Sequence, residues 1–502
     1  MNDHEASAAA GAELLTVEEM YRADAAALAG GIAGETLMEN AGRAVAGEIR
    51  NRWARRHVVV LCGPGNNGGD GFVIARILAA EGWPVTVALL GKRERLKGAA
   101  ALNATRWEGS LRPLEVAVLD DAALVVDALF GAGLAREVDG PARAVIEALN
   151  ARQLPCVAVD IPSGVHGDTG AVLGTAPHCR LTVTFCRRKP GHLLLPGRVY
   201  AGEVVVSDIG IPESVLPGIG SRTAANAPAL WIDRYPWPRP MDHKYNRGHV
   251  LIAGGEAMTG AARLAARAAY RVGAGMVTIA SPPAVLPIYA AEMAGLLVSP
   301  VANAEEFARL LDDQRKNAVL VGPGCGIGRT TRQMARAALE TGRATILDAD
   351  ALTVFQDDRA GLCALLKGKP AVITPHEGEF ARVFSHAGPR LDRARAAAAE
   401  CGAVVLLKGA DTVIAAPDGH AAINHNAPPT LATAGAGDVL SGLIVGLLAQ
   451  GMAAFQAACA GAWLHGEAAT IFGAGLIASD LPEVLPQVLK RLISLHRPRY
   501  GG

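Results

Sequence analysis

The chain has 502 residues, a length typical of two or three domains of roughly 100–200 residues each. Half of its residues are hydrophobic and 19% are charged, a composition that excludes wholesale disorder. Lys plus Arg and Asp plus Glu both number 48, so the formal net charge is zero. Non-specific binding to nucleic acid or to an acidic membrane needs a basic surplus, so we expect neither partner.

Eight cysteines are present and none forms a C-x-x-C pair, which predicts buried thiols in a reducing compartment. The first residues lack the basic and apolar regions of a signal peptide, so we expect a cytoplasmic protein. The uncharged segment 439–464 is long enough to span a bilayer, but Gly451 divides it and it contains polar side chains. We interpret it as two short buried helices.

The first half of the chain begins with a helical pattern over residues 13–56. Short apolar strands then alternate with helices, a pattern that predicts a parallel sheet with helices on both faces, a Rossmann-like three-layer α/β sandwich. Ligands of such sheets bind at the carboxyl ends of the strands. The predicted strands are His57–Cys62, Pro84–Leu90, Ala123–Ala128, Cys156–Val159, Leu181–Phe185 and Glu203–Ser207.

Five prolines between residues 217 and 240 predict a stiff, extended connector over 217–242. A second α/β series follows it, so we predict two domains, residues 1–222 and 223–502. The predicted strands of the second domain are His249–Ala253, Met276–Ala280, Ala318–Val321, Ala344–Leu347, Ala371–Thr374, Ala403–Leu407 and Thr412–Ala415.

A glycine-rich loop, CGPGNNGGDG over residues 62–71, joins the first strand of the sheet to a helix. It matches the dinucleotide motif G-x-G-x-x-G, but the next strand ends in Gly91-Lys92 rather than in the acidic residue that would hold a ribose. No Lys-Ser/Thr pair closes it as a phosphate loop. We interpret it as a ligand-binding loop; a tight turn with an Asp that caps the helix is the alternative.

Two further strand ends carry carboxylates, Asp127 in VDALFGAG and Asp160 in VDIPSG. A single Asp at a strand end often only caps a helix. Two of them facing an Asn-rich loop predict a site for an alkali cation and a polar ligand, since oxygen ligands with one or two charges suit K⁺ or Na⁺ better than zinc.

These motifs, together with residues 185–212, resemble the NAD(P)H-hydrate epimerase family over about residues 13–216. The resemblance implies K⁺ at Asn67, Asp127 and Ser163. Asp160 is our candidate for the acid/base, or else for the stabiliser of a cationic ring intermediate. Ala132 stands where the family often has Thr. The implied site for the hydrated nucleotide is Asn66, Asn67, Gly68, Gly69, Asp70, Gly131, Ala132, Gly133, Leu134, Ala135, Arg136, Glu137 and Asp160.

In the second half, the segment TLATAGAGDVLSG over residues 430–442 places small residues and Asp438 at the start of an apolar helix. A helix N-terminus presents free N–H groups and the positive end of its dipole to a phosphate. Asp438 is then placed to take a proton from a hydroxyl that meets the phosphate. An Asp that only caps the helix is the alternative.

GAGD resembles the ribokinase-like superfamily, and residues 240–490 resemble its ADP-dependent NAD(P)H-hydrate dehydratases, through HKYNRG, TPHEGE and KGADT among others. Ala434 and Ala436 and the segment 424–429 depart from the common pattern. The resemblance implies that the hydrate is bound by Ala261, Gly324, His376 and Asp438. It implies that the adenine nucleotide is bound by Lys408, Gly409, Ala410, Asp411, Thr412, Thr430, Leu431, Ala432, Thr433, Ala434, Gly435, Ala436 and Gly437.

The order of the two halves resembles bifunctional repair enzymes that act on the hydrates of NADH and NADPH. The resemblance implies that the first half interconverts the R and S hydrates. The second half would use ADP with Mg²⁺ to dehydrate the S form, giving NAD(P)H, AMP and phosphate. We expect a homo-oligomer whose partners are these small molecules. The alternative is a ribokinase-like small-molecule kinase with a non-catalytic interaction domain before it.

Overall fold

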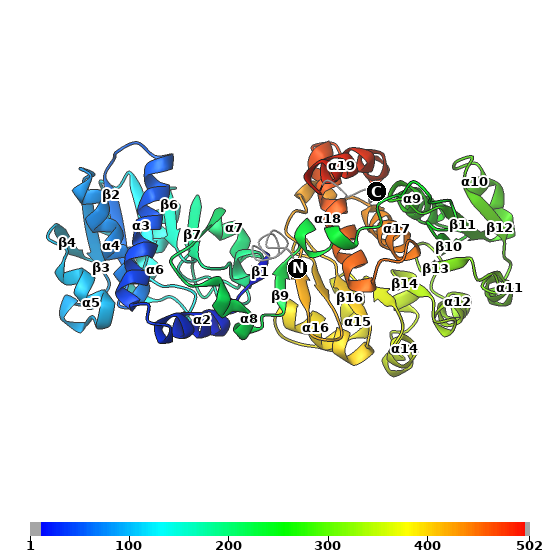
Figure 1. Ribbon diagram of the computed structural model, residues 1–502, viewed down its shortest axis with the longest axis horizontal. Helices are drawn as coiled ribbons and strands as arrows, with labels where there is room; N and C mark the ends of the chain where they lie inside the picture. The colour runs from blue at the N-terminus through cyan, green and yellow to red at the C-terminus, as the bar shows by residue number, and fades with distance from the viewer. Residues whose placement is uncertain (1–11, 497–502) are drawn as a thin grey trace. The chain divides into compact units, whose positions relative to one another are not determined.

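A computed structural model of the protein describes residues 12–496 and is shown in Figure 1. The chain forms two compact units, one of which comprises Glu13–Thr223, while the other begins at Ala224. The predicted boundary after residue 222 lies one residue before this division.

The first unit contains a seven-stranded sheet in the order β4-β3-β2-β5-β6-β7-β8, and every neighbouring pair is parallel. The order reverses between β2 and β5, which is where open α/β sheets bind their ligands. Its strands are β2 (Val58–Cys62), β3 (Val85–Leu89), β4 (Ser110–Pro113), β5 (Leu124–Ala128), β6 (Cys156–Val159), β7 (Leu181–Phe185) and β8 (Glu203–Ser207).

Helices cover both faces of this sheet, so the predicted three-layer architecture is confirmed. Alternate residues of one strand enter different cores: Val58 and Val60 pack on one face, and Val59 and Leu61 on the other. The first core is closed by α2 (Val17–Ala29), α3 (Gly34–Arg52), α4 (Asn66–Ala80) and α5 (Gly98–Thr105), and the second by α6 (Gly140–Ala151).

The second unit contains a larger sheet in the order β18-β17-β16-β15-β14-β13-β10-β11-β12. Neighbours from β10 to β16 are parallel, whereas β17 pairs antiparallel with both β16 and β18. Its strands are β10 (His249–Ala253), β11 (Met276–Ser281), β12 (Leu297–Pro300), β13 (Lys316–Val321), β14 (Ala344–Leu347), β15 (Ala371–Ile373), β16 (Val404–Leu407), β17 (Val413–Ala415) and β18 (Ala421–Ile423).

One face of this sheet carries α9 (Thr259–Arg271), α17 (Ala436–Ala449), α18 (Ala454–Phe472) and α19 (Asp480–His496), which share the main core. The other face carries α12 (Arg329–Glu340), α14 (Arg359–Leu366), α15 (Glu377–Val383) and α16 (Arg390–Cys401), as Figure 1 shows. Segment 439–464 falls within α17 and α18, so its interpretation as two buried helices is confirmed. Among the described residues, no helix combines the length and apolarity needed to cross a bilayer.

Two local predictions in these sheets and helices were incomplete. The pattern over 13–56 is two helices, α2 and α3, after the short strand β1 (Glu13–Leu14). The strands β4, β9 (Thr223–Ala225), β12 and β18 were not predicted; β4 and β12 are partly exposed and therefore lack a strong apolar pattern. The remaining short helices are α7 (Gly197–Ala201), α8 (Leu216–Ile219), α10 (Leu286–Ala290), α11 (Ala304–Leu310) and α13 (Asp350–Thr353).

The prediction of an extended connector over 217–242 is wrong. After β9, the chain forms two 3₁₀ turns, Pro228–Leu230 and Ile232–Arg234, which pack on the second unit. Trp231 between them is 1% exposed and its ring lies 5.7 Å from that of Trp463. Burial of aromatic side chains therefore outweighs the preference of the prolines for extended backbone.

Candidate active sites

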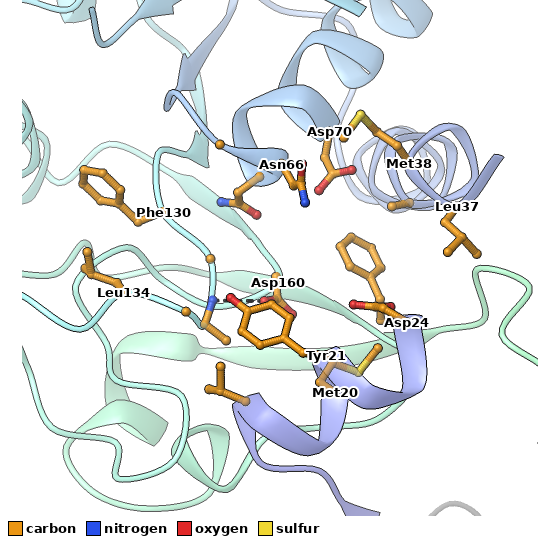
Figure 2. Close-up of a pocket in the computed structure, with 18 of the residues that line it drawn as sticks. Met20, Tyr21, Asp24, Leu37, Met38, Asn66, Asp70, Phe130, Leu134 and Asp160 are labelled. Atoms are coloured by element: carbon orange, nitrogen blue, oxygen red, sulfur yellow. Dashed lines mark hydrogen bonds between the residues drawn. The ribbon is translucent and has the colours of Figure 1, made fainter. Parts of the chain in front are cut away.

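The first unit has a cavity of about 610 Å³ at the carboxyl ends of β2 and β5. Helix α2 forms one wall, α3 a second, and the first turn of α4 a third, as Figure 2 shows. Its position at the point where the strand order reverses is the one expected for a ligand of this fold.

The Asn-rich loop supplies the wall at α4, which begins at Asn66 directly after the loop. The turn is tight: a Cβ at Gly68 would lie 1.9 Å from the carbonyl oxygen of Gly63. Asn66, Asn67 and Asp70 line the cavity, whereas Gly68 and Gly69 do not. The Nδ2 atom of Asn67 is buried without a hydrogen-bond acceptor, and the oxygen of a ligand would satisfy it.

The loop after β5 supplies the facing wall. Of the residues predicted there, Gly131, Ala132, Gly133, Leu134 and Arg136 line the cavity, whereas Ala135 and Glu137 do not. The loop folds against α2, because a Cβ at Gly133 would lie 2.0 Å from the Tyr21 hydroxyl oxygen.

Asp160 lies between these walls with an unusual backbone, φ +68°, a conformation that costs about 1–3 kcal/mol and is concentrated at functional sites. Its Oδ1 accepts hydrogen bonds from Lys189 Nζ at 2.5 Å and Thr184 Oγ1 at 3.0 Å, and its Oδ2 from Ala132 N at 3.2 Å. Burial opposes ionisation, but the Lys189 charge and these hydrogen bonds hold the pKa of Asp160 below its usual value. Asp160 is therefore a fixed, ionised carboxylate.

His192 stabilises this arrangement through hydrogen bonds to the backbone of Asp160 and of Lys189. Its Nε2 donates to the carbonyl oxygen of Asp160 at 2.8 Å, and its Nδ1 accepts from the backbone N–H of Lys189 at 2.9 Å. Burial, aided by the Lys189 charge, lowers the pKa of His192 to about 4, so the ring is neutral near pH 7. The sequence motif contained Lys189 and His192, but no role had been predicted for either.

Two more carboxyl groups line the cavity, and the pKa of each is raised rather than lowered. Burial, and then the charges of Asp160 and Asp24, raise the pKa of Asp70 well above its usual value. Burial also raises the pKa of Asp24 to about 6, against the effect of Lys189. Asp24 and Tyr21 were not predicted; the only sequence signal is their spacing of three, which places both on one face of α2.

Asp127 and Ser163 lie behind the cavity wall rather than in it. Ser163 donates through N to Asp127 Oδ2 at 2.7 Å and through Oγ to Oδ1 at 2.6 Å. Leu129 N donates to Oδ1 at 3.3 Å. Burial raises the pKa of Asp127 to about 6 against these hydrogen bonds. Within residues 12–496, no cationic side chain forms an ion pair with this buried carboxylate.

In the second unit, Gly324, His376 and Lys408 follow the strands β13, β15 and β16, whereas Ala261 lies in the first turn of α9. Gly435 is the N-cap of α17 and Asp438 lies in its first turn. Burial, and then the charge of Asp348, raise the pKa of Asp438 to about 6, whereas Lys408 opposes the rise. Asp438 thus has a pKa close to the pH at which a general base operates.

A buried charge network supports this helix start. Lys408 Nζ donates to Asp348 Oδ1 at 2.7 Å and lies 3.7 Å from Glu379 Oε2, and Ser441 Oγ in α17 donates to Asp348 Oδ2 at 2.7 Å. Burial disfavours the charged amine, but the two carboxylates raise the pKa of Lys408. Asp348 and Glu379 were not predicted as site residues, since each needs a partner distant in sequence.

Ala261 and Gly324 adjoin each other, because a Cβ at Gly324 would lie 3.2 Å from that of Ala261. The His376 side chain accepts from Glu379 N at 3.2 Å and caps α15. His376 and Lys408 are paired across the ends of β15 and β16 by an isolated bridge.

The predicted nucleotide residues form two loops. In the first, Thr412 Oγ1 accepts from Gly409 N and donates to Gly409 O, and Asp411 lies 3.5 Å from Arg390 Nε. In the second, Thr430 Oγ1 is buried without a hydrogen-bond partner, whereas Ala432 and Ala434 are exposed. Within the described chain, no group of three or more His, Cys, Asp or Glu side chains is arranged to hold a metal ion.

The unusual segment 424–429 has a structural explanation. Asn226 Nδ2 donates to Asn424 Oδ1 at 2.7 Å, Asn424 Nδ2 donates to Asn426 Oδ1 at 3.0 Å, and Asn426 Nδ2 donates to Trp463 O at 2.9 Å. This chain of amides ties the segment before the second loop to α18, so its asparagines hold backbone in place.

Two protein families match the chain. Residues 34–191 match the family described as YjeF-related protein N-terminus, and residues 249–491 match the family described as NAD(P)H-hydrate dehydratase. The match to the first family begins after α2, so that helix and its cavity-lining side chains lie outside it.

Curated relatives match along most of the chain. The bifunctional NAD(P)H-hydrate repair enzyme of Salinibacter ruber is 38% identical, over 91% of this chain and 92% of its own length. The enzyme of the same name from Coxiella burnetii is 36% identical, over 91% and 95%. A crystal structure of an ADP/ATP-dependent NAD(P)H-hydrate dehydratase from Bacillus subtilis is 30% identical with a TM-score of 0.44, over 51% of this chain and 94% of that one.

Proposed function

The chain belongs to the family of bifunctional NAD(P)H-hydrate repair enzymes, and from this membership we propose where and how each activity is carried out. It is an epimerase and a dehydratase of hydrated NADH and NADPH. We assign the epimerase to residues 1–222, with the cavity between α2 and α4 as its site, and the dehydratase to residues 223–502, with its site at the start of α17.

The observation that carries the epimerase assignment is the fixed, ionised Asp160 in a cavity that also contains carboxyl groups of raised pKa. R and S hydrates differ at C6 of the nicotinamide ring, so interconversion needs the hydroxyl to leave and water to return on the other face. Loss of hydroxide leaves a cationic ring, which an adjacent carboxylate stabilises. We therefore assign Asp160 as the electrostatic stabiliser, because its ionised form is held by donors at both oxygens: Lys189 and Thr184 at Oδ1, and Ala132 N at Oδ2.

The hydrate would bind with its phosphates toward the first turn of α4, where backbone N–H groups and Asn66 are exposed to the cavity. Buried charges in proteins are paired or coordinate a metal ion, and Asp127 is buried without a cationic partner in the described chain. With Asn67 and Ser163 it would supply the oxygen ligands that suit K⁺. The ion would neutralise Asp127 and hold the loops after β2 and β5 in their binding positions.

In the dehydratase site, we propose that the ADP phosphates meet the N-terminus of α17, where Gly435, Ala436 and Gly437 provide backbone donors. Ala434 and Ala436 remove possible side-chain donors but leave these N–H groups. The loops Lys408–Thr412 and Thr430–Gly437 would hold the rest of the nucleotide. The buried hydroxyl of Thr430 has no partner in the described chain, and a nucleotide atom would supply one.

Asp438 would take the proton of the C6 hydroxyl, whose oxygen then attacks the terminal phosphorus of ADP, and AMP leaves. The phosphorylated hydrate expels phosphate as the ring nitrogen forms the double bond, which regenerates NAD(P)H. Mg²⁺ would enter with the nucleotide, since it needs only one or two protein carboxylates, and would neutralise developing charge. Asp348 and Asp350 are the carboxylates whose charges act on Asp438, and they would be the candidates for that role.

The kinase alternative, with a non-catalytic first half, is not favoured, because the relatives match both halves under a single bifunctional name. The test is incubation of mixed R and S hydrates of NADPH with ADP, Mg²⁺ and K⁺, following the absorbance of the reformed dihydronicotinamide. We expect complete conversion of both hydrates and no reaction without ADP. A stable phosphorylated product, or conversion that stops when the S hydrate is consumed, would contradict the proposal.

A further inference from the structure

Helix α2 forms a wall of the epimerase cavity, although it lies outside the region that matches the family. The helix is well defined from its start, where Thr16 Oγ1 accepts from Glu19 N and Glu19 Oε2 accepts from Thr16 N. Val17, Met20, Tyr21, Asp24 and Leu28 face the cavity from this helix. The wall therefore has an apolar surface with one carboxyl group in it.

That carboxyl group belongs to Asp24. In Figure 2, Asp24 and Tyr21 extend from α2 toward Asp160, with Asn66 and Asp70 above them on α4. Asp24 accepts no hydrogen bond and forms no ion pair in the described chain, in contrast to Asp160, which has three donors. One cavity thus contains an immobilised carboxylate and a carboxyl group that is free to exchange a proton.

We propose that Asp24 is the catalytic acid/base of epimerisation, transferring the proton to and from the oxygen at C6 of the hydrated nicotinamide. The inference rests on the proposed site of the epimerase. The helix that closes the cavity would then supply the proton, and the sheet would supply the stabilising charge.

The step balances without an oxidant or a reductant. The Asp24 carboxylic acid gives its proton to the C6 hydroxyl, the C–O bond breaks with its electron pair going to oxygen, and water leaves. The N1 lone pair forms the N1=C6 bond, and Asp160 offsets the positive charge of the ring. Water then adds to the opposite face of C6 and releases a proton to solvent, from which Asp24 is reprotonated. In the reverse direction, Asp24 accepts the proton of the incoming water.

The surroundings of Asp24 suit this exchange better than those of Asp70. The titratable groups facing Asp24 are Tyr21 on its own helix, Asp70 on α4, Asp160 after β6, and Cys186 and Lys189 after β7. Burial raises the pKa of Asp24 to about 6, near the operating pH, where a group both gives and takes a proton efficiently. Burial and the charges of Asp160 and Asp24 raise the pKa of Asp70 well above its usual value, which disfavours release of its proton.

The test uses the full chain without ADP, so that the dehydratase does not consume the S hydrate. The purified R hydrate is converted in H₂¹⁸O between pH 5 and 8, R and S are separated chromatographically, and the spontaneous rate is subtracted. The variants are Asp24→Asn and Asp24→Glu, with Glu18→Gln as the matched control, an exposed acid on the same helix that does not line the cavity.

We expect wild-type R-to-S conversion to fall as pH rises above about 6, with ¹⁸O incorporated at C6. Asp24→Asn should lower the rate by about 10²–10⁴-fold and abolish the fall in rate above pH 6 (the pH limb), with KM for the hydrate changed little. Asp24→Glu should recover part of the rate and the limb, and Glu18→Gln should match wild type.

An Asp24→Asn enzyme within threefold of wild type, or one that keeps the pH limb, would overturn the role of Asp24. Conversion without ¹⁸O incorporation would overturn the step itself. A wild-type chain no faster than the spontaneous reaction would overturn the proposed epimerase site as well. The two failures are distinguishable, because Asp160→Asn should still abolish conversion when only the Asp24 inference is wrong.

Discussion

Asp438 offers a prediction in which activity and stability move in opposite directions. Its carboxylate lies in the first turn of α17, where an acidic residue normally stabilises a helix. Burial and the neighbouring Asp348 charge nevertheless raise its pKa from 3.8 to about 6. The folded protein therefore holds the ionised form less favourably than the unfolded chain does, and above pH 6 this carboxylate destabilises the fold.

The magnitude follows from the pKa difference. The interval from 3.8 to about 6 corresponds to about 3 kcal/mol at neutral pH, and partial exposure of the side chain reduces this to about 1–2 kcal/mol. Asp438→Asn should raise the free energy of unfolding of the second unit by that amount at pH 7.5, and by progressively less as pH falls from 6 toward 4. The same variant should lose ADP-driven dehydration by about 10²–10⁴-fold, because its general base is gone.

The assays are urea unfolding, with the transition of the second unit identified by its shift when ADP is added, and dehydration of the S hydrate from pH 5 to 8. Wild-type activity should rise with pH through about 6. Asp392→Asn is the matched control, since Asp392 is likewise the third residue of a helix, α16, and is exposed. That control should lose about 0.3–1 kcal/mol of stability and retain full activity. An Asp438→Asn chain that is less stable than wild type, or that keeps near-normal turnover, would show that Asp438 only caps the helix.

Three further substitutions test other parts of the two sites. Asp348→Asn should lower the free energy of unfolding by about 3 kcal/mol, because the buried Lys408 amine then has only Glu379 as a carboxylate partner. It should also move the rise of dehydration rate with pH to lower pH, and an unchanged pH profile would refute the electrostatic link to Asp438. Asp160→Asn should reduce epimerisation by about 10²–10³-fold while the purified S hydrate is dehydrated at the wild-type rate, and equal loss of both activities would argue against separate sites. Gly133→Ala would place a Cβ 2.0 Å from the hydroxyl oxygen of Tyr21, a residue that is 60% exposed and whose side chain can therefore move. We expect unchanged stability and a rise in epimerase KM of about fivefold, equivalent to about 1 kcal/mol; an unaltered KM would place Tyr21 outside the binding surface.

The sequence by itself determined the architecture and the family. Apolar strands alternating with helices predicted both parallel sheets, since this periodicity reflects which face of each element is buried. The loop at residues 62–71 and the helix start at 435–438 were identifiable because a tight turn and a helix N-terminus are local structures, set by a few consecutive residues. The strand-end carboxylates Asp127 and Asp160 were found for the same reason, because each lies in a short contiguous motif.

Only the tertiary structure decided which charges meet. Lys189 lies 29 residues from Asp160, and Lys408 lies 60 from Asp348, so no local pattern indicates either pair. The same holds for Asp24, an ordinary polar residue of an amphipathic helix until α2 packs over the sheet and buries it beside Asp160. Trp231 and Tyr235 likewise fold a proline-rich segment that the sequence predicted as extended. A local motif specifies backbone conformation, whereas desolvation and charge proximity, which determine the pKa of each carboxyl group, arise only when distant segments pack together.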